Sequence, residues 1–145
     1  MKQLMAAIML IGGGVGPTHA QTSPTGPIMP DAIKWTSPPT LPGVQTAWVL
    51  GASDKPGPYL LRAKIAQGSR IPPHTHPEER NGTVLSGTVY LGFSGTFDES
   101  KAAAIPVGGV WVAPANVPHF IWAKDGDVVF QCGGIGPSGT NFVKP

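Results

Sequence analysis

The sequence contains a single cysteine, a low share of charged residues (12%) and few aromatic ones (8%). One cysteine excludes an intrachain disulfide, and the apolar residues before Cys132 predict a buried, unreactive thiol. The net charge is only +2, and the basic residues are scattered along the chain. This excludes the concentrated positive surface that binding to nucleic acids or anionic membranes requires.

Long apolar runs are also missing, except near the N-terminus. Lys2 precedes an apolar stretch at residues 4–11, and small residues lead up to Ala20. This pattern predicts a secretion signal over residues 1–20 that is cleaved after Ala20. The stretch is too short and too rich in glycine for a membrane span, and an uncleaved anchor is the alternative. We therefore expect an exported protein, periplasmic or secreted, with no membrane insertion after signal cleavage.

The remainder of the chain has the size of one domain and an apolar fraction that can support a core. Residues 21–44 are rich in proline and predict an extended arm, and residues 45–145 form the expected body. Gly and Pro separate many short apolar runs, which is typical of an antiparallel sandwich or barrel. Only residues 98–104 suggest a helical turn. The fold class is all-β, with strands expected at residues 46–50, 59–66, 83–85, 88–93, 110–112, 119–122 and 128–132.

Three of the four histidines lie outside the predicted signal, and they fall in two short segments. Residues two apart on a strand project from the same face, so His74 and His76 can converge on one ion. A turn at Asn116, a residue that tolerates left-handed backbone, can bring His119 towards them. Because imidazole is the commonest metal ligand, His74, His76 and His119 are the predicted metal ligands.

The two histidine segments resemble the paired motifs of the cupin superfamily. Residues 68–87 contain glycine, five residues, His-x-His and a closing glycine, and residues 108–123 contain glycine, five residues, proline and a later histidine. Residues 76–93 and 136–145 are also similar to a group of small, exported, single-domain cupins. The resemblance implies a single double-stranded β-helix (jelly-roll) barrel over residues 45–135, preceded by the extended arm.

The chain departs from the cupin pattern at Arg80, which stands where the family has a glutamate ligand. A guanidinium keeps its charge and repels a cation, so Arg80 either turns away or faces the metal across an anion. Three site structures stay open: a three-histidine centre with free positions, a local bulge that turns Glu78 or Glu79 inward as a fourth ligand, or a pocket without metal. Asn116 and Ala123 replace a family glycine and asparagine.

The resemblance implies a metal-dependent small-molecule enzyme of oxygenase, lyase or isomerase type, with one divalent transition metal (Fe, Mn, Ni or Zn). Apolar and aromatic side chains around a barrel mouth favour a small-molecule ligand, which is anionic if Arg80 orients a carboxylate. No catalytic residue is assigned. The alternatives are a non-catalytic binding protein for a small molecule or metal, and a metal-free protein. Small cupins often pair, so we expect a homodimer. The predicted substrate-binding residues are Arg80, Tyr90, Trp111 and Trp122.

Overall fold

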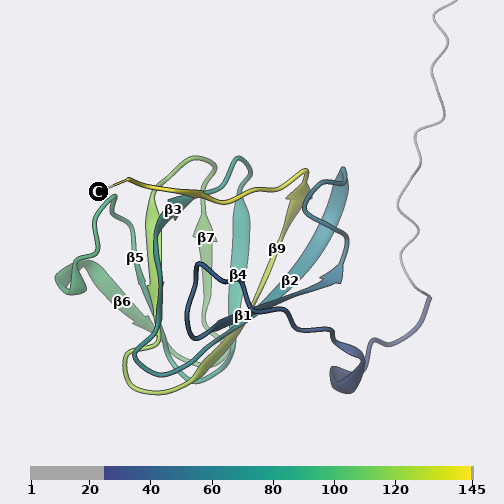
Figure 1. Ribbon diagram of the computed structural model, residues 1–145, viewed down its shortest axis with the longest axis horizontal. Helices are drawn as coiled ribbons and strands as arrows, with labels where there is room; N and C mark the ends of the chain where they lie inside the picture. The colour runs from purple at the N-terminus through teal and green to yellow at the C-terminus, as the bar shows by residue number, and fades with distance from the viewer. Residues whose placement is uncertain (1–24, 145) are drawn as a thin grey trace, which may run out of the picture.

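The computed structural model describes residues 25–144 as two antiparallel sheets that face each other across a common core (Figure 1). The first sheet has the order β1 (Val44–Leu50), β2 (Gly57–Ile65), β9 (Val128–Gly136), β4 (Arg80–Ser86) and β7 (Val110–Ala113). The second has the order β10 (Asn141–Phe142), β3 (Arg70–Thr75), β8 (His119–Trp122), β5 (Val89–Gly92) and β6 (Ala102–Ile105). Two short 3-10 helices complete the described elements, η1 (Pro30–Ala32) and η2 (Glu99–Lys101). The all-β jelly-roll prediction is confirmed.

Two strands, β6 and β10, were not among those expected from the sequence, and β3 was expected only through the His74 and His76 pair. The helical turn expected at residues 98–104 is confined to η2, because Ala102–Ile105 pair with β5 as strand β6. Strand β3 contains Pro72 and Pro73, which cannot donate backbone hydrogen bonds. Its pairing with β8 accordingly shifts register between Ile71 and His74. This irregular strand ends at the predicted metal site.

The core lies between the sheets and consists of side chains that alternate inward along each strand. Its fully buried members include Ile65, Val84, Val89 and Val128. Neighbouring strands of one sheet approach closely where a glycine lies opposite an aromatic residue, as Gly82 on β4 does opposite Trp111 on β7. A Cβ at Gly82 would stand 2.2 Å from the Trp111 ring, so only glycine fits there. This close approach sets the position of an indole that lines the interior.

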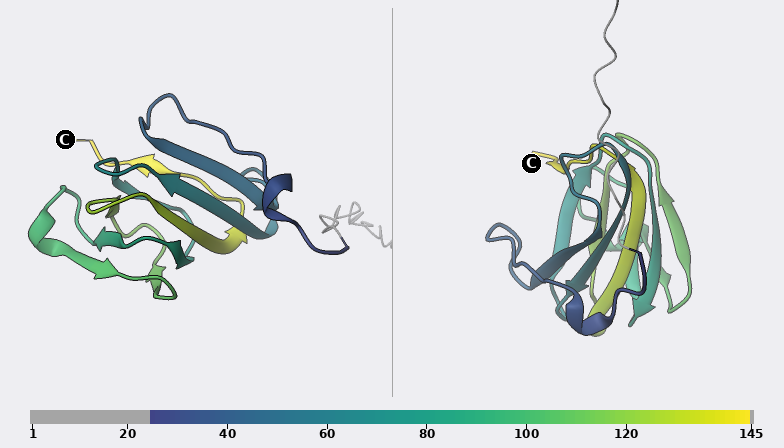
Figure 2. Two further views of the ribbon diagram at one scale, coloured as in Figure 1. Left: turned by 90° about the horizontal axis from the view of Figure 1, so that it is seen from below. Right: turned by 90° about the vertical axis from the view of Figure 1, so that its right-hand side faces the viewer.

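The N-terminal arm is attached to the barrel near the start of β1. Thr36 forms an isolated bridge with Thr46, and Leu41 packs against the core. The Lys64 ammonium lies 4.1 Å from the centre of the Trp35 ring. Figure 2 shows the arm leaving one end of the barrel. The predicted signal over residues 1–20 lies outside the described residues, and no described helix has the length and apolar character needed to cross a membrane.

Candidate metal centre

The three predicted ligands meet inside the barrel, between the ends of two neighbouring strands. His74 lies on β3 and pairs in register with His119, the first residue of β8, and His76 follows directly after β3. All three are buried, with 2–4% of their surface exposed. One ligand atom from each lies within 4.8 Å of the others. The φ of 61° at Asn116 provides the left-handed turn expected before His119.

Each imidazole is oriented by a backbone carbonyl that contacts its Nδ1 atom. A carbonyl oxygen only accepts hydrogen bonds, so each Nδ1 carries the proton and each Nε2 keeps a free lone pair. Such an outer hydrogen bond fixes the tautomer and the ring orientation of a metal-ligating histidine. The acceptors are the carbonyl oxygens of Pro72 (2.7 Å from His74), Gly139 (2.7 Å from His76) and Val117 (3.0 Å from His119).

The three imidazoles are neutral at physiological pH. Burial lowers the pKa of His74 to about 3, with the charge of His119 adding to the effect. Burial and the Arg80 charge lower the pKa of His76 to about 4. The pKa of His119 is lowered as well, mainly by burial. Neutral rings do not need to lose a proton before binding a metal.

The donor set fits a divalent transition metal. Metal–nitrogen bonds are about 2.0–2.1 Å for zinc, so nitrogens as far as 4.8 Å apart have to move closer together to bind one ion. Imidazole suits zinc, copper, iron and nickel alike, so the ligands do not select among them. The histidines border a cavity of about 90 Å³. Its wall also includes Thr46, Leu61, Trp111, Phe130 and Cys132.

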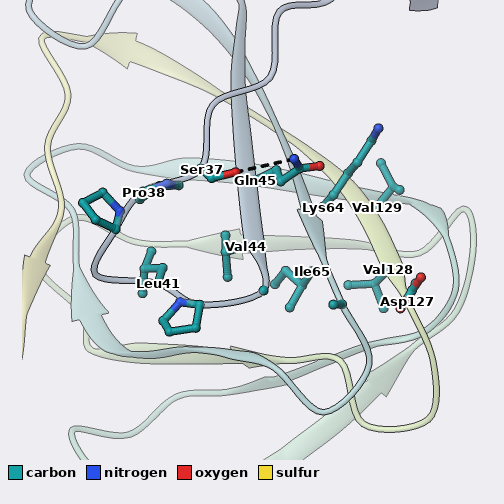
Figure 3. Close-up of a pocket in the computed structure, with 14 residues that line it drawn as sticks. Ser37, Pro38, Leu41, Val44, Gln45, Lys64, Ile65, Asp127, Val128 and Val129 are labelled. Atoms are coloured by element: carbon teal, nitrogen blue, oxygen red, sulfur yellow. Dashed lines mark hydrogen bonds between the residues drawn. The ribbon is translucent and has the colours of Figure 1, made fainter.

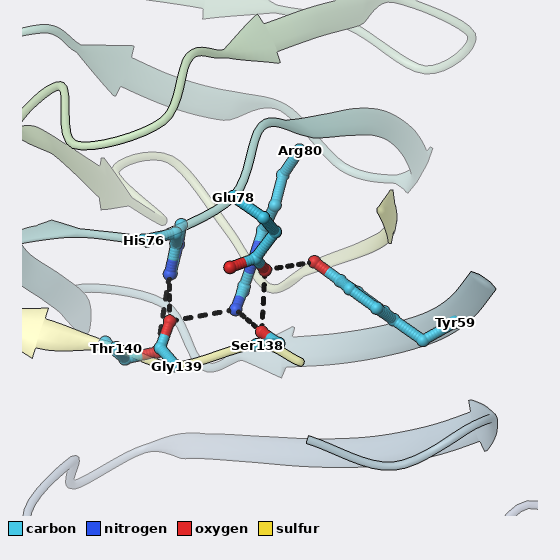
Figure 4. Close-up of polar contacts among 7 residues, drawn as sticks. All are labelled: Tyr59, His76, Glu78, Arg80, Ser138, Gly139 and Thr140. Carbon is cyan, nitrogen blue, oxygen red and sulfur yellow. Dashed lines mark hydrogen bonds and ion pairs between the residues drawn. The ribbon is translucent and has the colours of Figure 1, made fainter. Parts of the chain in front are cut away.

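Arg80 also faces this cavity and is not a solvated surface arginine. Its Nε donates to Glu78 Oε1 at 2.8 Å, and its Nη2 donates to Ser138 Oγ (2.6 Å) and to the Gly139 carbonyl (3.2 Å) (Figure 4). The Gly139 oxygen therefore accepts from both His76 and Arg80. The C-terminal segment before β10 thus holds both a ligand and the guanidinium.

The structure does not bring Glu78 or Glu79 into the histidine cluster. Glu78 Oε1 accepts hydrogen bonds from Arg80, from Ser138 Oγ (2.6 Å) and from the Tyr59 hydroxyl (2.6 Å), and it serves as counter-ion to the guanidinium. These hydrogen bonds lower the pKa of Glu78 against the opposing effect of its burial. Glu79 is exposed on the outside of the barrel. The bulge hypothesis, with a glutamate as fourth ligand, therefore has no support in this geometry.

Of the predicted aromatic contacts, only Trp111 lines the cavity. Inward residues of β8 are His119 and Ile121, so strand alternation turns Trp122 to the outer face. Tyr90 lies opposite Trp122 on that same face, and its hydroxyl donates to Asp125. Tyr90 and Trp122 therefore do not line the cavity that the histidines border, and their assignment as substrate-binding residues stays a prediction.

Sequence reasoning missed Tyr59, Ser138 and Gly139, which complete the polar network. Parity contained a usable signal for Arg80, because residues 74, 76 and 80 share one parity and all line the cavity. The partners from β2 and the C-terminal segment come from distant parts of the chain. Their proximity follows from the sheet order and from no local pattern.

A larger cleft of about 640 Å³ lies outside the barrel, between the arm and strands β1, β2 and β9 (Figure 3). Prolines and aliphatic side chains make up much of its wall, with Lys64 and Asp127 at its margin. Leu41 borders both this cleft and the histidine cavity. The arm therefore forms part of the wall between them.

Comparison with known proteins identifies the family. The family model described as Cupin matches residues 57–142, which include both histidine segments. The chain belongs to the cupin family. Among curated proteins, this cupin is 34% identical over 84 residues to germin-like protein 5-1 of Oryza sativa subsp. japonica, which covers 56% of the chain and 33% of the relative. It is 36% identical over 90 residues to germin-like protein subfamily 2 member 1 of Arabidopsis thaliana, covering 61% and 36%.

This cupin spans about a third of the length of those curated relatives. Among solved structures, the polyketide cyclase RemF from Streptomyces resistomycificus superposes with a TM-score of 0.68 at 16% identity, covering 83% of this chain and 86% of that one. That likeness shows the fold alone. An oxalate oxidase in complex with the substrate analogue glycolate has a TM-score of 0.51 at 26% identity, covering 60% and 46%.

Proposed function

We propose that this cupin is an exported, metal-dependent small-molecule enzyme that works from the His74–His76–His119 centre. The observation that supports it best is the convergence of three neutral imidazoles whose Nδ1 atoms are all held by backbone carbonyls. These hydrogen bonds fix the tautomer and the ring orientation, as a metal-ligating histidine requires. The similarity to a solved oxalate oxidase structure supports a reaction on a small acid.

The chain's own residues have defined roles in this proposal. The three Nε2 atoms would hold iron, manganese, nickel or zinc, and the metal would supply Lewis acidity or redox chemistry. With three protein ligands, positions stay open for a substrate. Trp111, Phe130 and Cys132 give the cavity an apolar wall that limits water. Burial raises the pKa of the Cys132 thiol to about 12, so this residue serves as wall and not as nucleophile.

The test begins with metal content. Purified without chelators, the wild-type protein should contain close to one transition-metal ion per chain by elemental analysis, and His76→Ala should lose it. The loaded protein is then offered oxalate, glycolate and other small acids, with oxygen uptake and product formation as readouts. Arg70→Ala, on the outside of the barrel, is the control and should behave as wild type.

Two results would contradict the proposal in different ways. Failure to bind any of the four metals would remove the metal centre. Full metal occupancy without turnover of any small acid would favour a non-catalytic binding protein, which a ligand would stabilise against heat without being consumed. Export and the homodimer expected from the sequence stay predictions.

A further inference from the structure

Arg80 is held in a way that leaves part of its guanidinium unused. Its side chain is 8% exposed, and the Nε and Nη2 atoms bind Glu78, Ser138 and Gly139. No hydrogen bond among the described residues involves Nη1. Glu78 Oε2 is the one fully enclosed polar side-chain atom without a partner among the described residues, so Nη1 retains some accessible surface. Arg80 itself is buried and lines the cavity. The two N–H groups of Nη1 therefore have no acceptor among the described residues, on a side chain that lines the cavity.

Stability alone does not account for this ion pair. Glu78 Oε2 is enclosed and has no hydrogen-bond partner among the described residues, so the pair is incompletely satisfied. A buried pair of this kind is often no more stable than apolar residues of the same volume. Tyr59 and Ser138 nevertheless fix the Glu78 carboxylate from two sides. The network is better suited to aim the guanidinium than to strengthen the fold.

The charges of the site select an anion. Glu78 balances Arg80, and an imidazole supplies no negative charge, so a divalent metal on the three histidines would bring two uncompensated positive charges into the barrel. Buried charge of this kind requires a partner of opposite sign. In a site with a glutamate ligand at position 80, the protein itself would supply one negative charge. Here the ligand has to supply it.

We propose that Arg80 Nη1 and the metal on His74, His76 and His119 together bind the carboxylate of a small organic acid. This inference rests on the proposed metal centre and assigns its substrate class. The guanidinium donates to the carboxylate, which is the stronger, charge-assisted kind of hydrogen bond. The cavity of about 90 Å³ has room for roughly half a dozen water-sized atoms, which limits the acid to a few non-hydrogen atoms.

The experiment measures binding by calorimetry, with glycolate and oxalate as probes and glycolamide as their uncharged counterpart. Arg80→Gln alone leaves Glu78 unpaired and can unfold the protein, so the informative variant is Arg80→Gln combined with Glu78→Gln. Arg62→Gln is the matched control, because Arg62 Nε donates to Gln131 (2.9 Å) away from the cavity. Metal content is measured in every sample.

In the metal-loaded wild type we expect both acids to bind and glycolamide to bind at least tenfold more weakly. The double variant should keep its metal and lose at least tenfold in affinity for the acids, with Arg62→Gln unchanged. Equal affinity in the double variant and the wild type would overturn the role of Arg80. Equal affinity for glycolate and glycolamide would overturn the substrate class. Both results leave the metal centre standing, whereas a wild-type protein without metal would count against the proposed function itself.

Discussion

Replacing Arg80 and its partner Glu78 together would place a metal ligand at position 80. The Arg80 side chain lines the cavity that the three histidines border, and its counter-ion is Glu78. Position 80 is therefore placed to contribute a ligand if its side chain is short and negative. A carboxylate at position 80 would then complete a site of four ligands.

The variant Arg80→Glu combined with Glu78→Gln should bind the metal at least tenfold more tightly than the wild type. A carboxylate at position 80 adds a ligand of opposite charge, and the second change prevents repulsion between two carboxylates. Competition with a chelator of known affinity measures the effect. Arg62→Gln changes the net charge of the chain by the same amount outside the cavity and should leave the metal affinity as it is. Unchanged affinity in the double variant would show that position 80 does not reach the metal.

At the scale of the elements, the segment between β9 and β10 is the support of the site. Ser138 donates to Glu78 and accepts from Arg80, and the Gly139 carbonyl accepts from Arg80 and His76. These contacts join the end of the chain to β3 and β4. The segment therefore positions the guanidinium without being a candidate metal ligand.

Ser138→Ala should weaken the binding of small acids several-fold while the metal content stays constant. The change removes one hydrogen bond to the guanidinium and one to the carboxylate, and it should lower the free energy of unfolding by about 1–3 kcal/mol. Calorimetry and denaturant unfolding provide the two measurements. Ser94→Ala, whose hydroxyl contacts Thr96 away from the cavity, is the control. Loss of metal in parallel with acid binding would mean that Ser138 supports the whole site.

Gly82→Ala should destabilise the barrel by about 1–3 kcal/mol, the usual penalty for overpacking. The added methyl would overlap the Trp111 ring, which cannot move without disturbing the cavity wall. Near-ultraviolet circular dichroism and denaturant unfolding report the displacement. Gly126→Ala, which has no atom within 4 Å of the added Cβ and no positive φ, should be tolerated. Equal stability of both variants would show that Trp111 has room to shift.

The alternation of side chains along strands made part of this arrangement predictable from the sequence. The two histidine segments, the strand-rich body and the turn at Asn116 all follow from local patterns. Arg80 has the parity of His74 and His76 and lines the same cavity, although residues 76–79 between β3 and β4 are not in a strand. Strand β10 has only two residues and no sequence signal of its own. Contacts such as Tyr59 with Glu78 depend on sheet order, which a single sequence does not reveal.

At the scale of the whole molecule, the buried histidines make stability depend on pH. The pKa values of His74 and His76 in the folded protein are about 3 and 4, below the unfolded value of about 6.5. Between these values the unfolded chain binds more protons than the folded one. The stability is therefore complete above pH 6.5 and falls as the pH decreases towards 4.

For the metal-free protein, the free energy of unfolding should drop by about 2 kcal/mol per buried imidazole between pH 6.5 and pH 5. Glu78 contributes little in this interval, because its pKa lies below the ordinary value. Denaturant unfolding in the presence of a chelator gives the measurement. His74→Gln should flatten the curve by one imidazole's share. A flat profile in the wild type would show that the histidines titrate normally in the folded protein.

The Gly139 carbonyl accepts hydrogen bonds from both His76 and Arg80 and so connects the C-terminal segment to the histidine centre. A metal that fixes the His76 ring also fixes the Gly139 carbonyl oxygen that the ring contacts. The segment that follows Gly139 leads to the hydrogen bond from the Val143 N–H to the Pro73 carbonyl, so this bond is steadied as well. Linkage requires the reverse to hold, so docking of this tail must tighten binding at His76 by the same factor. The exchange rate of the Val143 amide proton therefore reports whether a metal occupies the histidine centre inside the barrel.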